Sequence, residues 1–102
     1  MNFFRKIKAS LTLRQAINKA DNAHAANGQR YYVMPQGKRK LIIMDRKAFR
    51  YLKHKRYITY KAFVSDLERE CFYCTPYANG DKQLSKEDLL AKRKQFFDWY
   101  AG

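Results

Sequence analysis

Residues 30–44 read RYYVMPQGKRKLIIM and contain the expected sheet. Two runs rich in aromatic and β-branched residues, 30–34 and 40–44, flank the turn sequence PQGK at 35–38. This pattern is typical of a β-hairpin. Both runs are apolar on both faces, and an isolated hairpin is only marginally stable in water. We therefore expect the hairpin to pack against helices.

The first helix is expected before the hairpin, over residues 12–27. Thr12 and Gln15 fit a capping box, and Gly28 can adopt the left-handed conformation that ends a helix. The apolar residues between these caps follow helical spacing, with His24 on the same stripe near the C-terminal end.

Three more helices are expected after the hairpin. They should cover roughly residues 46–55, 60–73 and 86–100, with the N-caps Asp45, Thr59 and Ser85. Pro76 ends the third helix because proline has no amide proton to donate. The residues expected to face inward are Ala48, Phe49, Leu52, Phe63, Val64, Leu67, Cys71, Leu89, Leu90, Phe96, Phe97 and Tyr100. The order α-β-β-α-α-α predicts an α+β fold with a two-stranded antiparallel hairpin.

The length of 102 residues predicts a single domain. We expect a basic N-terminal extension at residues 1–11 and one α+β domain at residues 12–102. No apolar run approaches the roughly 20 residues of a membrane span. The basic N-terminus also lacks the apolar segment of a signal peptide. These features predict a cytoplasmic protein, in which the two cysteines are thiols.

The charge of the chain is concentrated in its first part. Residues 1–61 contain sixteen Lys or Arg residues and two acids, whereas residues 62–102 contain six Lys or Arg residues and seven acids. Such an uneven distribution attracts polyanions. The composition therefore indicates a class of partner and does not indicate a reaction.

Residues 38–61 combine cations with tyrosines, which suits phosphates and bases respectively. We predict that the hairpin loop and the following helix form one basic surface that binds DNA or RNA, mainly through phosphate contacts. Its cations would be Lys38, Arg39, Lys40, Arg46, Lys47, Arg50, Lys53, Lys55 and Arg56, and Tyr51 or Tyr57 would stack on bases.

Other interpretations of this basic stretch remain open. It could bind an acidic protein or a membrane surface, or it could be a solvated face without a charged partner. A helix-turn-helix is disfavoured because the helix that would enter the major groove carries Asp66, Glu68 and Glu70.

No catalytic constellation is visible, so we expect a protein that is not an enzyme and has no cofactor. Cys71 and Cys74 form a C-x-x-C pair, but it lies at the C-terminal end of an expected helix, where the dipole disfavours a thiolate. A zinc site would need two further ligands, and His24 and His54 lie on different elements. We interpret the cysteines as small buried residues, and no metal site is predicted.

The C-terminal sequence FFDWY at 96–100 is too aromatic for one helical face. The aromatic residues could be buried in a monomer under the loop 75–84, or they could join two copies in a homodimer. They could also anchor an acidic protein partner, with the basic face steering it. An interaction adaptor is thus the alternative function.

Two stretches carry a resemblance to a known group of proteins. They are QRYYV at 29–33, after an alanine-rich helix, and RECFYCTPY at 69–77, before the Trp-Tyr C-terminus. Over most of residues 12–100 the chain resembles small uncharacterised proteins of bacterial mobile genetic elements. The resemblance implies a bacterial, cytoplasmic setting, and it implies no functional residues.

Overall fold

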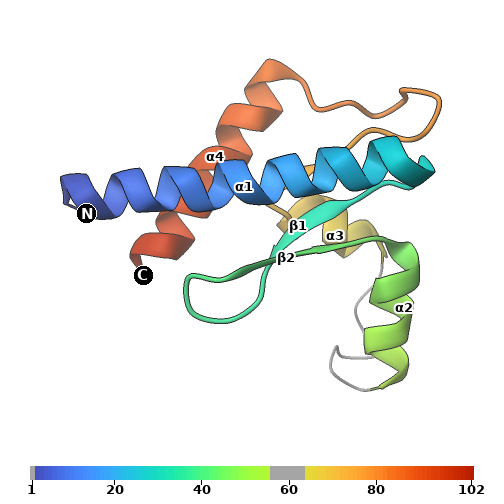
Figure 1. Ribbon diagram of the computed structural model, residues 1–102, viewed down its shortest axis with the longest axis horizontal. Coiled ribbons are helices and arrows are strands. Elements are labelled where there is room, and N and C mark those ends of the chain that lie inside the picture. Colours follow the sequence, from blue (N-terminus) through green and yellow to red (C-terminus); the bar gives the residue numbers. More distant parts are fainter. Residues whose placement is uncertain (1, 56–63) are drawn as a thin grey trace.

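The expected hairpin is present, and it belongs to a three-stranded sheet (Figure 1). The computed structural model describes residues 2–55 and 64–102. Strands β1 (Tyr32–Pro35) and β2 (Leu41–Met44) pair antiparallel, with Tyr32 opposite Met44 and Pro35 opposite Leu41. The α+β prediction is confirmed at this level, but the third strand was not expected.

The third strand, β3 (Tyr73–Cys74), pairs antiparallel with β1, so the strand order is β2-β1-β3. The prediction of helix up to residue 73 is wrong, because α3 (Val64–Glu70) ends before Cys71. Backbone pairing replaces the helix here: Phe72 N donates to Val33 O at 2.9 Å, and Thr75 N donates to Tyr31 O at 2.9 Å. The expected cap Thr59 and residues 60–63 lie outside the described residues.

Helix α1 (Phe3–Asn27) begins much earlier than the sequence predicted. Its N-cap is Asn2, whose side chain accepts a hydrogen bond from Arg5 N at 2.8 Å. The Thr12 cap is wrong, since Thr12 Oγ1 donates to Lys8 O within the helix. Residues 3–11, predicted to belong to a basic extension, thus form the first turns of α1. At the other end Gly28 adopts φ 75°, so the predicted stop is confirmed.

The other two caps in the described residues are confirmed. Asp45 accepts from Ala48 N at 2.8 Å and starts α2 (Arg46–His54). Ser85 Oγ accepts from Asp88 N at 3.1 Å and starts α4 (Lys86–Ala101).

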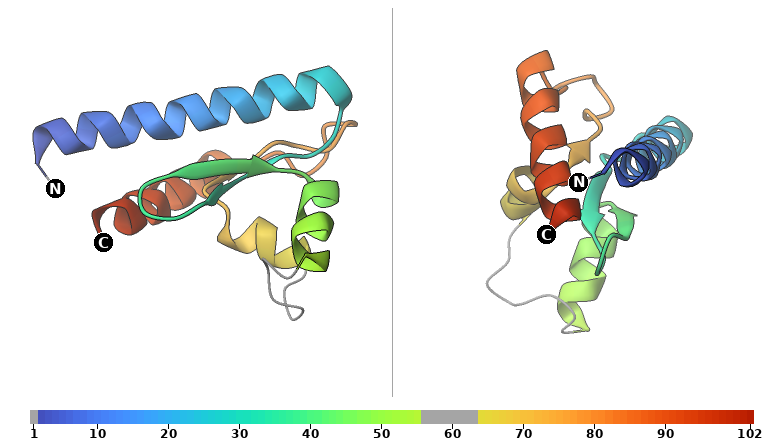
Figure 2. Two further views of the ribbon diagram at one scale, coloured as in Figure 1. Left: turned by 60° about the horizontal axis from the view of Figure 1, so that its bottom comes forward. Right: turned by 90° about the vertical axis from the view of Figure 1, so that its left-hand side faces the viewer.

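The sheet separates two cores, which explains why both strands are apolar on both faces. Tyr32, Ile42 and Met44 belong to the core on the side of α2 and α3, whereas Val33 and Ile43 belong to the core under α1 and α4. Figure 2 shows α1 and the two short helices on different sides of the sheet. The first core contains Ala9, Leu13, Ala16, Ala20, Val33, Phe72, Phe96 and Tyr100, and the second contains Tyr32, Met44, Phe49, Leu67, Cys71 and Cys74.

Helix α4 contributes only its last turns to the core. Phe96 and Tyr100 are buried, as expected, but Leu89 and Leu90 are 41% and 59% exposed, so their inward placement is wrong. The reason is that the first turns of α4 extend past α1 (Figure 1). Within the described residues, no helix combines the length and the apolar character needed to cross a membrane.

Candidate nucleic-acid interface

The structure divides the predicted basic surface into two. Lys38, Arg39 and Lys40 lie in the loop between β1 and β2, whereas α2 begins after the opposite end of β2. Figure 1 shows the loop and α2 at opposite ends of the hairpin. The two groups of cations therefore do not form one continuous surface, contrary to our expectation. Arg56 and Tyr57 lie outside the described residues.

The loop instead meets the start of α1. The hairpin loop, the first turns of α1 and the last turn of α4 enclose a groove of about 530 Å³. We call this the hairpin-loop groove, and its lining residues are Asn2, Phe4, Arg5, Lys8, Thr12, Lys38, Arg39, Lys40 and Tyr100. Five of them are cations and none is a carboxylate, so the groove carries a positive potential.

Arg39 holds the loop in place. Its φ of 60° lies in the left-handed region, which is uncommon for a residue with a side chain. The guanidinium Nε donates to Tyr100 O at 3.2 Å, and the guanidinium lies 5.5 Å from the centre of the Tyr100 ring. A cation also suits the negative end of the α4 dipole. Arg39 thus fixes the loop against α4, while Lys38 and Lys40 remain exposed.

The acids of the C-terminal part do not neutralise this groove. The salt bridges between described residues join Arg30 to Glu68, Arg69 to Asp66 and to Glu70, and Lys94 to Asp98. None of these cations lines the groove.

Helix α2 carries the second basic surface. Lys47, Arg50, Tyr51 and His54 are exposed and follow the spacing i, i+3, i+4, i+7, so they share one side of the helix, away from buried Phe49. We call this side the α2 face. Lys55 Nζ lies 5.8 Å from the centre of the Tyr51 ring, which places Lys55 at the edge of the face.

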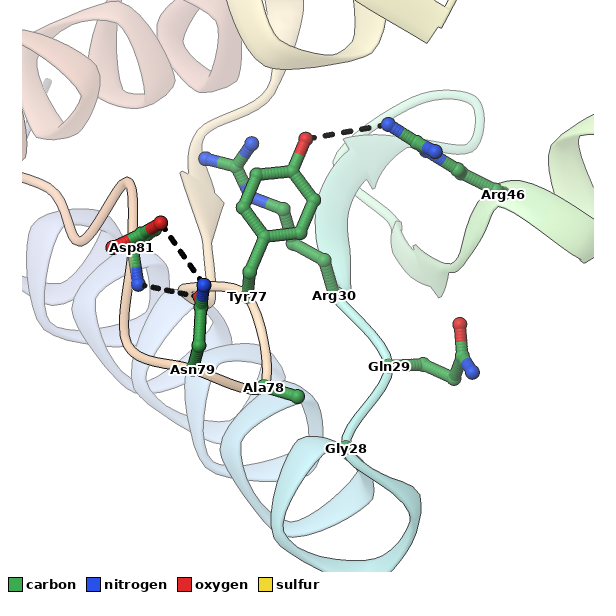
Figure 3. A pocket seen from close by; sticks show the side chains of 8 residues that line it. All are labelled: Gly28, Gln29, Arg30, Arg46, Tyr77, Ala78, Asn79 and Asp81. Carbon is green, nitrogen blue, oxygen red and sulfur yellow. Dashed lines mark hydrogen bonds between the residues drawn. The ribbon is translucent and has the colours of Figure 1, made fainter.

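Two predicted cations of α2 have other surroundings. Arg46 turns toward the loop after β3, where Nη2 donates to the Tyr77 hydroxyl at 3.3 Å (Figure 3). Lys53 is half-buried. Neither residue extends the α2 face.

Arg30 also contacts Tyr77. It is buried beneath the Tyr77 ring, whose centre lies 4.7 Å from the guanidinium (Figure 3). Nε donates to Thr75 O at 2.8 Å, and Nη2 donates to Lys82 O at 3.3 Å and to Cys74 Sγ at 3.2 Å. Arg30 is therefore a structural residue that joins α3, β3 and the following loop to the start of β1.

Both cysteines are buried free thiols. The hydrogen bond with Cys71, together with the charges of Arg30 and Lys92, lowers the pKa of Cys74 to about 7 against the opposing effect of burial. The same pairing and burial raise the pKa of Cys71 far above its usual value.

Lys92 Nζ also donates to Glu68 O at 2.7 Å and to Cys71 O at 3.1 Å, so it binds the carbonyls at the end of α3. Across residues 2–55 and 64–102, no group of three or more His, Cys, Asp or Glu side chains could hold a metal ion.

Sequence reasoning missed Arg5 and Lys8 as groove residues because it placed them in an extension. The available signal was Asn2, a good N-cap residue three positions before Arg5. A helix started there would have placed Arg5, Lys8 and Thr12 along one side, where a hairpin packed on the helix can reach them.

Comparison with known proteins gave no match to a family model, to a curated protein or to a solved structure.

Proposed function

We propose that the protein binds nucleic acid through phosphate contacts in the hairpin-loop groove. The observation that carries this proposal is the convergence of five cations from two distant segments on one concave site without a lining carboxylate. Like charges repel, so gathering them lowers the stability of the free protein. A phosphate backbone removes this repulsion, and its binding releases condensed counterions.

The groove contacts would be largely independent of base sequence. Lysine and arginine side chains directed at phosphates fix the position of a nucleic acid but do not read its bases. The α2 face is a separate, convex surface, which we expect to contribute less per cation than the groove.

No observation on the described residues favours the alternative of an interaction adaptor. The adaptor alternative uses the aromatic C-terminus as its anchor, but Phe96 and Tyr100 belong to the core under α1, and Trp99 is half-buried there. Their rings pack on Phe72 and on one another. These contacts leave Phe96 fully buried and Tyr100 only 3% exposed, so neither ring offers a partner a large surface.

Fluorescence anisotropy with labelled DNA and RNA oligonucleotides, single- and double-stranded, tests the proposal. Because Arg39 is bound to Tyr100, four groove cations remain. The logarithm of the affinity should fall with the logarithm of salt concentration with a slope of about −3.6 for duplex DNA and about −2.8 for single strands. Absence of binding at about 50 mM salt would contradict the proposal.

Two variants with equal loss of charge locate the site. The groove variant combines Arg5→Gln, Lys8→Gln and Lys40→Gln, and the α2 variant combines Lys47→Gln, Arg50→Gln and Lys55→Gln. The groove variant should lose more than about tenfold in affinity and about three units of salt slope, and the α2 variant should lose clearly less. Equal losses would mean that net charge alone drives binding and that the groove is not the site.

A further inference from the structure

The first turns of α1 are apolar on two opposite sides. Ala9, Leu13 and Ala16 face the core and are buried. Phe3, Ile7 and Leu11, spaced four residues apart, lie on the other side of the helix and are 71%, 45% and 50% exposed. We call Phe3, Ile7 and Leu11 the outer stripe. Phe4 lies beside it and is 80% exposed. A surface helix normally presents polar residues to water, so the outer stripe indicates a second partner.

The outer stripe is accessible in the folded protein. The start of α1 reaches beyond the hairpin loop and the C-terminal end of α4 (Figures 1 and 2). Because the outer stripe is opposite to the buried side, a partner could cover it without displacing any core contact.

The charges around the stripe identify the kind of partner. Lys6 lies next to Phe3 and Ile7 in a shallow hollow on this side of the helix. Arg14 is exposed three residues after Leu11, on the same side of the helix, and no acid precedes Asp21. A helix with Phe and Leu side chains flanked by Lys and Arg is suited to the interface of an anionic bilayer. The long Lys and Arg stems can extend from an inserted helix to the phosphate level.

A second copy of the chain fits this surface less well. It would bring the same cations together, with no acid on either helix segment to compensate.

We propose that the first three turns of α1 dock on an anionic lipid surface. The outer stripe would insert between the headgroups, and Lys6 and Arg14 would contact lipid phosphates. The helix would lie parallel to the surface, with the sheet and the other helices above it. This binding is reversible and peripheral, because one short stripe buries too little apolar surface for permanent anchoring.

Vesicle co-sedimentation tests the docking. The protein should bind vesicles of phosphatidylcholine with phosphatidylglycerol and should not bind phosphatidylcholine alone. A stripe variant with Phe3→Gln, Ile7→Gln and Leu11→Gln keeps every charge and uses a residue of good helix propensity. It should lose at least about tenfold in partition to the anionic vesicles. The control, Leu89→Gln with Leu90→Gln, removes exposed leucines of α4 and should bind like the wild type.

Three results would overturn the proposal: no binding to anionic vesicles, equal binding by the stripe variant, or a wild-type dimer in analytical ultracentrifugation that the stripe variant loses. Circular dichroism checks that the stripe variant is folded. If the stripe variant is unfolded, the single variant Phe3→Gln is measured instead, and its partition to anionic vesicles should be severalfold lower than that of the wild type. Phe3, Ile7 and Leu11 do not line the hairpin-loop groove, so oligonucleotide binding by these variants should be unchanged. Failure of lipid binding and failure of nucleic-acid binding are thus separate results.

Discussion

Replacement of Arg30 by Met should destabilise the protein strongly. The methionine keeps an apolar stem of similar length but removes the guanidinium, which is buried among four acceptors and two tyrosine rings. Thr75 is fully buried, so its carbonyl would lose its donor where water cannot replace it. No buried side-chain polar atom among the described residues lacks a partner at present.

The size of the effect follows from these contacts. An unsatisfied buried carbonyl costs about 1–3 kcal/mol. The cation–π contact with Tyr77 adds about 1 kcal/mol. The bonds to Lys82 O and to half-exposed Glu68 add about 1 kcal/mol together. The total is about 4 kcal/mol, a large part of the about 5–15 kcal/mol that stabilises a typical domain. For a chain of this size the melting temperature should fall by about 15–30 °C.

Arg39→Met is the matched control. Arg39 also donates to a carbonyl and lies over a tyrosine ring, but it is only half-buried. Its replacement should cost about 1 kcal/mol or less. Urea unfolding followed by circular dichroism measures both variants. If the two free energies of unfolding agree within about 1 kcal/mol, burial does not set the contribution of Arg30, and the reasoning fails.

Three further results are expected. Gly28→Ala should lower the free energy of unfolding, measured with urea, by about 1 kcal/mol because Gly28 has φ 75°. A variant as stable as the wild type would contradict the left-handed cap. Phe96→Ala should lower the free energy of unfolding by about 3–5 kcal/mol because Phe96 is fully buried. Leu90→Ala should change it by less than about 0.5 kcal/mol because Leu90 is exposed. Equal losses in the two variants would refute the observed burial along α4. The pKa of Cys74, about 7 in the folded chain, lies below its unfolded value of about 8.5, so the folded state releases the proton first. The free energy of unfolding should therefore rise as the pH increases from about 7 to about 8.5, and below pH 7 Cys74 should add no pH dependence. Cys74→Ala should abolish this rise, and a rise that persists in the variant would exclude Cys74 as its cause.

Local signals in the sequence were sufficient for the hairpin and for most helix ends. Asp45, Ser85 and Gly28 act through contacts within five residues, so their roles can be predicted from composition and spacing. The alternation of Tyr32 and Val33 between two cores also follows from the period of a strand.

Long-range contacts decided what the sequence did not predict. Residues 71–74 have a helix-compatible apolar pattern, but β1 lies about 40 positions earlier and offers them a free edge. Likewise the hairpin-loop groove exists because the loop packs beside turns of α1 about 30 positions away. The cations of the loop were predicted, but the element that completes their site was not.

The position of β1 in the middle of the sheet has a consequence for biosynthesis. A ribosome delivers β2 a few residues after β1, so this pairing can form early, but β3 and the aromatic end of α4 arrive only after about 30 to 60 further residues. At roughly 5–20 residues per second, the edge of β1 that pairs with β3 and the face of the sheet that α4 covers stay exposed for several seconds. During that interval the strongly positive first part of the polypeptide is exposed to the RNA of the ribosome itself, and its repulsion between copies opposes premature aggregation.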